Sequence, residues 1–389
     1  MTKRRLGIVV SHPIQYQAPL FRYLVAHTSI EPHVFFLTDH GVKLSFDPGF
    51  GRTIQYDVPL LEGFEHEFVR NWSPRPSPST PMGAINPGLP MALRRASVDA
   101  LLVHGWSNPS AWLACLSAAA MRTPYLIRGE AQPDVPSMPR SKVLVKHSLV
   151  GPLVQHAGAC LAIGSRNRRF YREYGVRSDR IFDAPYSVDT HRFSDAGDMG
   201  RLKRTDRLMG LGLDPARPVV LFAAKLQPWK RPLDVVDAMD LLGGCASLVV
   251  IGDGPLRAEI EERAAVRRWM RALGFVNQGE IAEWYGMADL FVLPSDREPW
   301  GLAVNEAMAA GAIPIVSDAV GCGDDLVTPE IGWIFETGNV KALADALEAG
   351  CAVAGSSERR SAAQERSHQW GLGATARGIE AAVEASVDP

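Results

Sequence analysis

The sequence has few features of a secreted, zinc-binding or membrane-spanning protein. It contains five cysteines among 389 residues, and none of them forms a Cys-x-x-Cys pair. This pattern argues against both a zinc site and a disulfide framework. The first apolar run, residues 6–10, ends at Ser11 and Pro13, so it is too short for a signal peptide or a membrane span. We therefore expect a cytoplasmic protein whose first apolar run is a buried strand.

Charge is nearly balanced over the whole chain but unevenly distributed along it. The formal net charge is −2, yet 22 Lys and Arg accompany 16 Asp and Glu through residue 200, and 19 accompany 27 beyond it. Residues 135–172 contain no acidic residue and seven basic ones: Arg140, Lys142, Lys146, Arg166, Arg168, Arg169 and Arg172. Two interpretations stay open, a solvated basic face and a contact with an anionic membrane surface or a phosphorylated acceptor.

Length and apolar pattern predict the architecture. Single cores rarely grow beyond about 250 to 300 residues, so 389 residues predict two or three domains. Short apolar runs alternate with amphipathic helical segments in both halves, which is typical of β-α-β units. We expect an α/β fold of two Rossmann-like, doubly wound parallel-sheet domains that face a cleft. The expected strands are 7–10, 32–37, 100–104, 125–127, 159–163, 219–223, 247–251, 271–273, 290–293 and 313–316.

The expected domains are 1–190, 191–365 and a C-terminal helix in 366–389. We expect the linker within residues 183–206, because this stretch follows a strand and lacks apolar periodicity. Residues 71–90 contain six prolines and predict an extended surface loop.

Two glutamates, Glu298 and Glu306, mark the most informative stretch of the chain, residues 294–311. A buried strand, a turn containing Gly301 and a helix from Leu302 are expected there. The start of such a helix presents unpaired N–H groups and the positive end of its dipole, which suits an anion such as a diphosphate. Carboxylates would repel phosphate, so we expect the two glutamates to accept hydrogen bonds from neutral hydroxyls.

Three further loops of the second half also follow expected strands, where ligands bind in open α/β sheets. Lys225 and Lys230 precede a helix that begins near Pro232, and they can converge on phosphates at its entrance. The turn containing Gly252 allows close approach of a ligand. Residues 275–278 can offer backbone groups to a base.

These motifs, in this order, resemble the donor domain of the retaining glycosyltransferases of family 4, also called group 1, which have the GT-B architecture. Lys225 and Lys230 match the segment that clamps the diphosphate, where the family usually has Arg and then Lys. The turn at 252–255 matches the family's glycine turn. The Glu-x7-Glu signature is matched by Glu298, Pro299, Trp300, Gly301, Leu302 and Glu306. Three ordered motifs are far more specific than one.

The resemblance implies a role for each of these residues. Glu298 would hold donor-sugar hydroxyls, Glu306 the ribose hydroxyls, and Lys225 with Lys230 would stabilise the diphosphate as leaving group. The amides of Gly301 and Leu302 would face the phosphates. The remaining expected donor-binding residues are Trp300, Pro299, Gly252, Val276 and Asn277, the last of these at the base. No Asp-x-Asp motif is present, so neither a metal nor another cofactor is expected.

The first half matches the family less closely. His12 follows the first strand and can bond a donor phosphate or an acceptor hydroxyl, or can simply hold its loop. Relatives often carry a histidine where this chain has Arg128 and Glu130. Either Arg128 contacts phosphate and Glu130 an acceptor hydroxyl, or the two form a salt bridge. His104, after another strand, is either a cleft residue or a satisfied strand-end histidine. The final helix resembles the one that crosses back to the first domain.

The sequence thus predicts a metal-independent transferase that moves a hexose-type sugar from a nucleotide-diphosphate sugar to an acceptor hydroxyl with retention. The acceptor is a glycan, as in polysaccharide biosynthesis, a glycolipid or a small molecule, and no nucleic-acid partner is expected. Alternatives are a sugar-nucleotide epimerase, a non-catalytic sugar-nucleotide-binding module and a peripheral membrane adaptor. The region 135–172 is the candidate contact with the inner membrane face.

Overall fold

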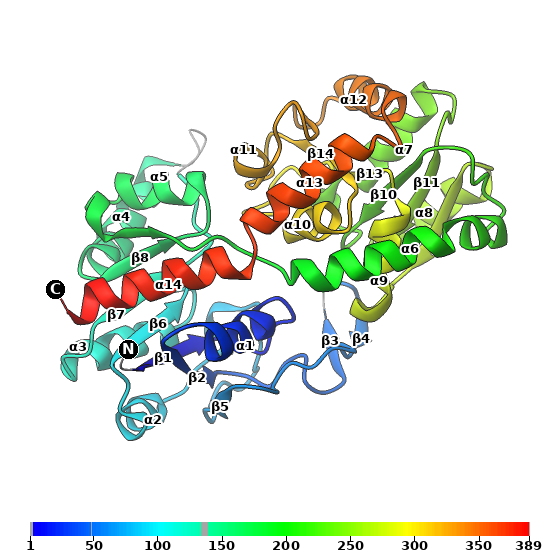
Figure 1. The fold of residues 1–389 in the computed structure, drawn as a ribbon. Helices are drawn as coiled ribbons and strands as arrows, with labels where there is room; N and C mark the ends of the chain where they lie inside the picture. The colour runs from blue at the N-terminus through cyan, green and yellow to red at the C-terminus, as the bar shows by residue number, and fades with distance from the viewer. Residues whose placement is uncertain (1–2, 48, 134–138, 389) are drawn as a thin grey trace. The chain divides into compact units, whose positions relative to one another are not determined.

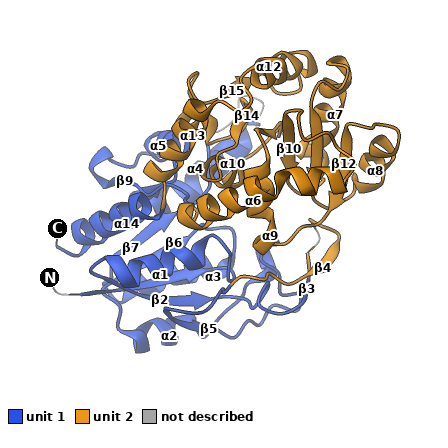
Figure 2. Cartoon of the chain, turned by 45° about the vertical axis from the view of Figure 1, so that its right-hand side comes forward, with its two compact units in different colours: residues 1–45, 59–187, 372–389 blue, residues 46–58, 188–371 orange. Residues whose placement is uncertain are grey.

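The computed structural model describes residues 3–47, 49–133 and 139–388, and it divides into two compact units. Unit 1 comprises Met1–Ser45, Pro59–Ser187 and Leu372–Pro389, and unit 2 comprises Phe46–Val58 and Val188–Gly371 (Figure 2). Each unit contains one large parallel sheet flanked by helices (Figure 1). The chain therefore has the expected α/β class with two Rossmann-like units.

Seven parallel strands form the sheet of unit 1. In spatial order they are β5 (Glu65–Phe68), β2 (Ile30–Phe36), β1 (Arg4–Val10), β6 (Ala100–His104), β7 (Tyr125–Arg128), β8 (Ala159–Ala162) and β9 (Ile181–Asp183). The register pairs Ile8 of β1 with Val34 on one side and Leu102 on the other. From β1 the strand order runs to β2 and β5 on one side and to β6, β7, β8 and β9 on the other, as in a doubly wound sheet.

The two faces of this sheet bury separate cores, because successive side chains of a strand point to opposite faces. Val9 and Leu101 belong to one core, whereas Ile8 and Leu102 belong to the other. Ile379 of the last helix is buried in that second core. The C-terminal helix therefore packs within unit 1.

Six parallel strands form the sheet of unit 2. In spatial order they are β12 (Met270–Gly274), β11 (Ser247–Ile251), β10 (Val219–Ala223), β13 (Leu290–Leu293), β14 (Ile313–Ser317) and β15 (Trp333–Phe335). The order reverses between β10 and β13, where Val220 pairs with Leu290. All ten strands expected from the sequence are present. Short buried parallel strands are continuous apolar runs, which makes them easy to recognise.

The helices cover these sheets. Unit 1 carries α1 (Gln17–His27), α2 (Leu89–Ala96), α3 (Pro109–Ala120), α4 (Arg140–Gln155), α5 (Ser165–Glu173) and α14 (Leu372–Val387). Unit 2 carries α6 (Thr190–Gly210), α7 (Pro232–Leu241), α8 (Arg257–Ala265), α9 (Gln278–Met287), α10 (Leu302–Ala309), α11 (Gly323–Leu326), α12 (Val340–Ala352) and α13 (Ser357–Gln369). Within the described ranges, no helix has both the length and the apolar character needed to cross a membrane.

Helix α6 occupies most of residues 183–206, where the sequence predicts the linker and where the chain passes from unit 1 to unit 2 after Ser187. Its start is capped by Asp189, whose side chain accepts a hydrogen bond from the Arg192 amide. Gly197 and Gly200 lie against α10 and α9, with backbone atoms so close that a Cβ at either position would clash. Glycines at a helix contact allow close packing but leave no apolar periodicity. The sequence pattern therefore concealed this helix.

The chain changes unit at positions that differ from the expected 190/191 and 365/366. It passes from unit 1 to unit 2 after Ser187 and returns after Gly371. It also crosses earlier, because residues 46–58, with β3 (Ser45–Asp47) and β4 (Arg52–Ile54), belong to unit 2. The proline-rich residues 71–90 are irregular apart from a 3-10 turn and the start of α2, as the sequence predicts.

Two glycines of α6, one in the middle of the helix and one at its end, give a matched test of this packing. Gly200→Ala should destabilise unit 2 by about 1–3 kcal/mol, because the new Cβ would lie 2.1 Å from the Glu283 carbonyl oxygen. Gly210→Ala, on the same helix with nothing within 4 Å of its Cβ position, should stabilise by roughly 0.5–1 kcal/mol. Urea unfolding of both variants measures the difference. Equal effects of the two substitutions would contradict the close contact of α6 with α9.

Candidate functional site

The candidate site lies at the carboxyl ends of the strands of unit 2. Loops follow β10, β11, β12, β13 and β14 there, and they contain every residue that the sequence marks in this half except Leu302 and Glu306, which lie on α10. Because β10 pairs with both β11 and β13, the strand order reverses at β10. Crevices at such reversals are the usual ligand sites of doubly wound sheets.

The loop after β13 is held by the loop after β14. The Gly321 amide donates to the Glu298 carbonyl oxygen at 2.9 Å, and the Cys322 amide donates to that of Trp300 at 2.8 Å. Gly301 then begins α10 with a φ of 103°. A Cβ there would lie 3.0 Å from a Val320 methyl group. Glycine therefore fits both the conformation and the space at this helix start, with Leu302 as the first helical residue.

Trp300 corrects one expected ligand contact. Its indole is 3% exposed and stacks on Trp370 with the ring centres 5.6 Å apart. Its N–H donates to the Asn305 side-chain oxygen at 2.9 Å. The side chain is thus used in packing, and Trp300 serves the site by anchoring the loop between Pro299 and Gly301.

Lys230 and Glu298 form an ion pair across the reversal point. Lys230 ends a 3-10 turn after β10, and its ammonium group donates to Glu298 Oε2 on the loop after β13. Both side chains are largely buried, at 18% and 16% exposure. Removing one partner from such a buried pair leaves an unpaired charge, which costs more than the pair itself contributes. The two residues that the sequence placed in separate roles therefore depend on each other.

Glu306 is partly buried one turn into α10 and accepts a hydrogen bond from the Tyr285 hydroxyl at 2.9 Å. Burial raises the pKa of its carboxyl to about 7, although the Tyr285 hydrogen bond and the charge of Arg192 act in the opposite direction. Near neutral pH this carboxyl is therefore protonated in part of the molecules, where it can donate a hydrogen bond, and ionised in the rest, where it can only accept. It is chemically suited to hydroxyl groups, the partners that the sequence predicts for it.

Lys225 forms an ion pair with Asp47, a partner that the sequence analysis did not predict. Its ammonium group donates to both oxygens of Asp47, at 3.0 and 3.1 Å. Asp47 is 178 positions away, and no pattern in the chain connects the two.

Gly252 lies beside the Lys225 loop with a φ of 146°, and a Cβ there would lie 1.9 Å from the Ala224 carbonyl oxygen. The turn after β11 therefore requires glycine.

Asn277 and Val276 follow β12. The Asn277 side-chain oxygen accepts from the Gln278 amide and caps α9. Its amide nitrogen donates to the Gln55 carbonyl oxygen at 2.9 Å. Val276 is partly exposed beside it. Asn277 thus has a structural role in addition to any contact with a base.

Arg128 of unit 1, for which the sequence left open a phosphate contact and a salt bridge with Glu130, is buried in internal contacts. Its side chain is 1% exposed and donates to the carbonyl oxygens of Ala184 and Pro185. Its guanidinium also lies 4.7 Å from the centre of the Tyr186 ring. A phosphate could not reach it without breaking this packing. Glu130 is exposed and accepts a hydrogen bond from the Tyr186 hydroxyl at 2.9 Å.

The two candidate histidines of unit 1, His12 and His104, differ in their surroundings. His12 follows β1, with its Nδ1 2.8 Å from the Ser11 hydroxyl and its ring edge-on to His40. His104 ends β6, with its Nδ1 3.2 Å from the Gln17 side-chain nitrogen. Burial, followed by the charge of Arg128, lowers the pKa of His104 to about 3, so this ring is neutral. His104 therefore cannot supply a positive charge.

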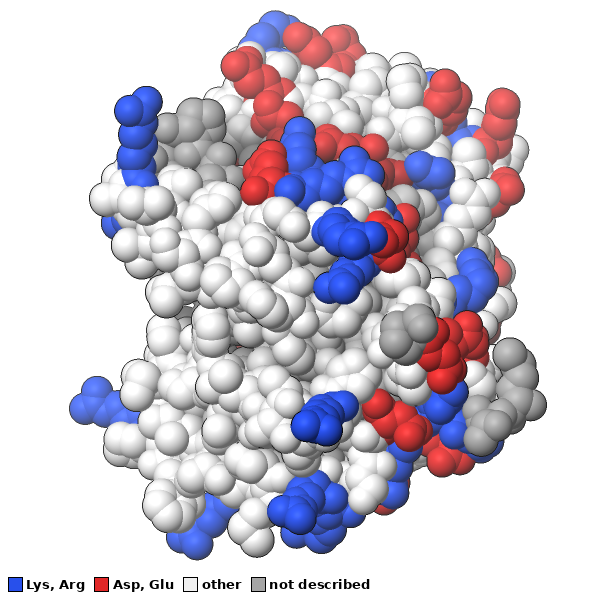
Figure 3. Space-filling view, turned by 90° about the vertical axis from the view of Figure 1, so that its left-hand side faces the viewer, with Lys and Arg blue, Asp and Glu red and all other residues white. Residues whose placement is uncertain are grey.

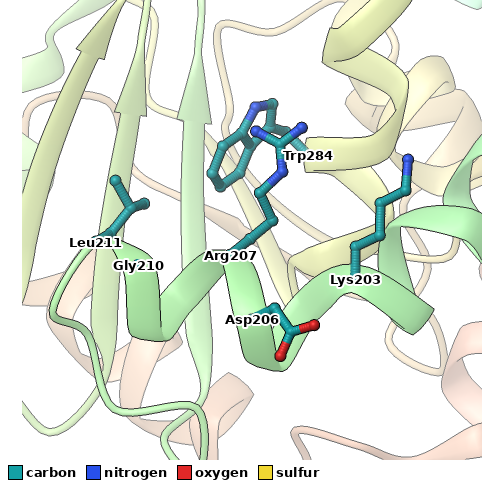
Figure 4. Close-up of a pocket in the computed structure, with 6 residues that line it drawn as sticks. All are labelled: Lys203, Asp206, Arg207, Gly210, Leu211 and Trp284. Carbon is teal, nitrogen blue, oxygen red and sulfur yellow. The ribbon is translucent and has the colours of Figure 1, made fainter.

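A pocket of about 380 Å³ elsewhere in unit 2 is not this site. Its lining residues are Lys203, Asp206, Arg207, Gly210, Leu211 and Trp284 (Figure 4). Arg207 lies over the Trp284 indole, while Asp206 points away from it. The neighbouring Arg204 pairs with Asp289, the residue before β13, so the pocket lies toward the amino ends of the strands. That is the edge opposite to the candidate site.

Residues 208–373 match the family model described as glycosyl transferases group 1. Among curated proteins, a D-inositol 3-phosphate glycosyltransferase of Xylanimonas cellulosilytica is 30% identical over 258 residues, which is 62% of this chain and 60% of that protein. The lipopolysaccharide core biosynthesis mannosyltransferase LpsB of Rhizobium meliloti is 34% identical over 176 residues, 42% of this chain and 48% of LpsB. The chain thus spans about half the length of the curated relatives it matches.

Solved structures share the fold over nearly the whole chain. A glycosyltransferase from Rickettsia africae aligns with a TM-score of 0.73 at 15% identity, covering 99% of each chain. Anabaena Alr3699/HepE in complex with UDP aligns with a TM-score of 0.72 at 16% identity, covering 97% of this chain and 98% of HepE. At this identity the likeness establishes the GT-B fold.

The raised pKa of Glu306 predicts a pH-dependent stability difference. Between pH 4.5, the ordinary pKa of a glutamate, and the raised pKa of about 7, the unfolded chain ionises this carboxyl while the folded chain resists ionisation. Stability contributed by the protonated carboxyl is therefore lost as pH rises through this interval. Glu306→Gln should be more stable than the wild type above pH 7, by on the order of 2–3 kcal/mol, and should match it below about pH 4. Urea unfolding across the pH range measures the difference.

Tyr285→Phe supplies the control for this test. It removes a donor to the carboxylate, so the pKa of Glu306 should rise further and the pH interval should shift upward. In a Glu306→Gln background the same change should leave the pH dependence unaltered. Parallel stability curves for the wild type and Glu306→Gln at every pH would contradict the assignment.

Proposed function

We propose that this chain, whose residues 208–373 belong to the glycosyl transferases group 1, transfers a sugar from a nucleotide-diphosphate sugar to an acceptor hydroxyl with retention. The observation that carries the proposal is the set of charges at the carboxyl edge of the second sheet. Lys225 and Lys230 follow β10, and Glu298 with Glu306 follow β13, on the two sides of the reversal point. Two cations suit a diphosphate, and two carboxylates suit hydroxyls.

In the proposed reaction, the bond between the sugar's anomeric carbon and the phosphate oxygen breaks. The departing diphosphate gains negative charge, which Lys225 and Lys230 would stabilise from fixed positions at the sheet edge. The acceptor oxygen forms the new bond on the same face of the sugar, and its proton passes to the departing phosphate oxygen. The two lysines supply the positive charge that a metal ion would otherwise provide, so metal independence is part of the proposal.

The carboxylates position the donor in this scheme. Glu306, with its pKa near 7, would bond the ribose hydroxyls while Tyr285 holds its other side. Glu298 would exchange its bond with Lys230 for one with a sugar hydroxyl when Lys230 turns to phosphate. The amides of Gly301 and Leu302 at the start of α10 add N–H groups directed at the phosphates. Lys230 would thus keep an anionic partner, and Glu298 would keep a hydrogen-bond donor.

The relatives support the substrate classes. One is named for inositol 3-phosphate and another for lipopolysaccharide core, and HepE was solved with UDP. We propose a nucleotide-sugar donor for this chain and a glycan, glycolipid or small-molecule acceptor. His12 and Glu130, which follow β1 and β7, remain the candidate acceptor-side residues. All five cysteines are free, which supports the cytoplasm as the proposed location.

The direct test measures release of nucleoside diphosphate from a panel of UDP-, GDP- and ADP-sugars with candidate acceptors. Lys230→Ala and Glu306→Ala should each lower kcat/KM for the donor by about 100- to 1,000-fold, because each removes a group that holds the transition state or the donor. Chelation with EDTA should leave the rate unchanged. Asp214→Asn, at an exposed position before β10, serves as the control variant.

The rival functions give different products in the same assay. An epimerase would convert the sugar of the donor without releasing diphosphate, and a binding module would do neither. Unchanged kinetics in Glu306→Ala would refute the assignment of the donor site. Inversion at the anomeric carbon, detected by NMR of the product, would refute retention alone.

We also propose that part of the basic window, residues 135–172, contacts an anionic membrane. Residues 134–138 lie outside the described structure, but α4 follows them with three exposed apolar side chains: Leu144 (68%), Val145 (58%) and Leu149 (58%). Basic and apolar groups on one helix suit a lipid surface. The charge is partly compensated, because Arg168 pairs with Asp183. On the face shown in Figure 3, several of the Lys and Arg side chains in the upper half lie beside Asp or Glu, whereas one at the upper left does not.

Vesicle sedimentation tests this surface. The protein should bind vesicles rich in anionic phospholipid more strongly than neutral ones, and binding should weaken as salt rises. Leu144→Ser combined with Leu149→Ser should reduce binding several-fold by removing apolar anchors. Leu116→Ser, at an equally exposed leucine of α3, should not. Equal loss with Leu116→Ser, or no binding at low salt, would eliminate the proposed contact.

A further inference from the structure

Residues 46–58, which we term the strap, form an unusual part of unit 2. They contain most of β3 and all of β4, which pair as a two-stranded ribbon. The chain on both sides of the strap, ending at Ser45 and resuming at Pro59, belongs to unit 1 (Figure 2). A segment of the first half of the sequence is thus built into the unit that carries the candidate donor site.

The strap contacts three neighbouring loops of that site. Asp47 pairs with Lys225 after β10, and Gly49 accepts a hydrogen bond from the Gln227 side chain at 2.6 Å. Arg52 reaches Asp253 after β11 at 3.4 Å. After β12, Gln55 accepts from Asn277 at 2.9 Å, and Asp57 accepts from the Gly279 amide at 2.9 Å. The strap therefore lies along the whole series of strand ends from β10 to β12.

Asp47 accepts hydrogen bonds from the Lys225 ammonium group in the position where a phosphate would bind. Both of its oxygens lie within 3.1 Å of the ammonium nitrogen, and its side chain is 10% exposed. The amides of Gly49 and Phe50 donate to Asp47 Oδ1 at 2.7 and 3.1 Å. Burial alone would raise the pKa of Asp47, but Lys225 and these amides together hold it below its usual value. The carboxylate is therefore ionised, and it fills the anion position of the lysine proposed to bind diphosphate.

The strap also fills the space beside residues 275–278. The Phe50 ring meets the Phe275 ring edge-on, with the centres 5.1 Å apart. The Arg52 guanidinium lies 5.0 Å from the centre of the Phe275 ring, and the Lys225 ammonium lies 4.7 Å from that of Phe50. Aromatic and cationic groups of this kind are the partners on which a flat base stacks. The strap thus covers residues 275–278, the segment expected to contact the base, and makes stacking contacts there of the kind that a base would make.

We propose that the strap is an autoinhibitory cover of the nucleotide site, in which Asp47 holds Lys225 in place of the donor's phosphate and leaves it when a nucleoside diphosphate binds. The inference rests on the proposed function of the same site. Its physical basis is that one ammonium group in this position cannot bind a carboxylate and a phosphate together without bringing two negative charges into contact. The apparent donor affinity is then the intrinsic affinity multiplied by the fraction of molecules in which the strap has left the site.

The test compares Asp47→Asn with Asp57→Asn, two identical changes in the same strap. Calorimetry measures binding of UDP, GDP, ADP, inorganic pyrophosphate and uridine to the full chain. Asp47→Asn should bind pyrophosphate and the matching nucleoside diphosphate about tenfold more tightly, because a competing charge is gone. Uridine, which lacks phosphate, should show no such gain. Asp57→Asn keeps the oxygen that accepts from Gly279 and should stay within about twofold of the wild type.

Gly49→Ala gives a second variant that leaves every charge in place. Its Cβ would lie 2.6 Å from the Lys225 ammonium nitrogen, so the strap and the lysine side chain must move apart. It should therefore raise diphosphate affinity as Asp47→Asn does. Hydrogen exchange supplies a readout without mutation. The Gly51 amide, which donates to the Asp47 carbonyl oxygen, should exchange faster when the wild type is saturated with the nucleoside diphosphate that it binds.

The outcomes separate this proposal from the one on which it rests. Diphosphate binding that Lys225→Ala weakens but Asp47→Asn fails to strengthen would overturn the autoinhibitory cover and leave the donor site standing. Weaker binding by Asp47→Asn, or slower exchange of the strap with nucleotide bound, would likewise overturn it, because Asp47 would then assist the lysine. Absence of diphosphate binding in the wild type, in Asp47→Asn and in Gly49→Ala would contradict both the autoinhibitory cover and the donor site.

Discussion

All six strands of the second sheet run in the same direction, and this single constraint brings every candidate donor-binding group to one edge. Loops that are far apart in the sequence become neighbours because each follows the carboxyl end of a strand. The reversal of strand order at β10 and β13 then places Lys230 opposite Glu298. The opposite edge of the same sheet carries a pocket with charged groups of its own, among them Lys203, Asp206 and Arg207.

Charge compensation is the second constraint on this edge. Three cations near the site have a carboxylate partner within unit 2: Lys230 has Glu298, Lys225 has Asp47, and Arg257 has Asp253. Largely buried charges require such partners, because an unpaired one is strongly destabilising. A phosphate ligand must therefore exchange partners with carboxylates already present. Donor binding and the internal ion pairs are thus parts of one electrostatic balance.

The sequence predicted those parts of the molecule that depend on local patterns. Buried parallel strands are short apolar runs, and the glycines at 252 and 301 lie where the backbone demands them. Helix α6 escaped prediction because glycines, not apolar side chains, make its closest contacts. The pairing of Asp47 with Lys225 and the burial of Arg128 escaped because each depends on contacts distant in the chain. Sequence patterns locate groups, whereas long-range packing determines which of them are available to a ligand.

The central claim is that the carboxyl edge of the second sheet binds a nucleoside diphosphate. A crystal structure of the full chain with the nucleoside diphosphate that binds it most tightly tests this claim most directly. The account predicts phosphates at Lys225 and Lys230, ribose hydroxyls at Glu306, and Asp47 withdrawn from Lys225. A nucleotide bound elsewhere, such as the pocket beside Arg207 and Trp284, would contradict the account.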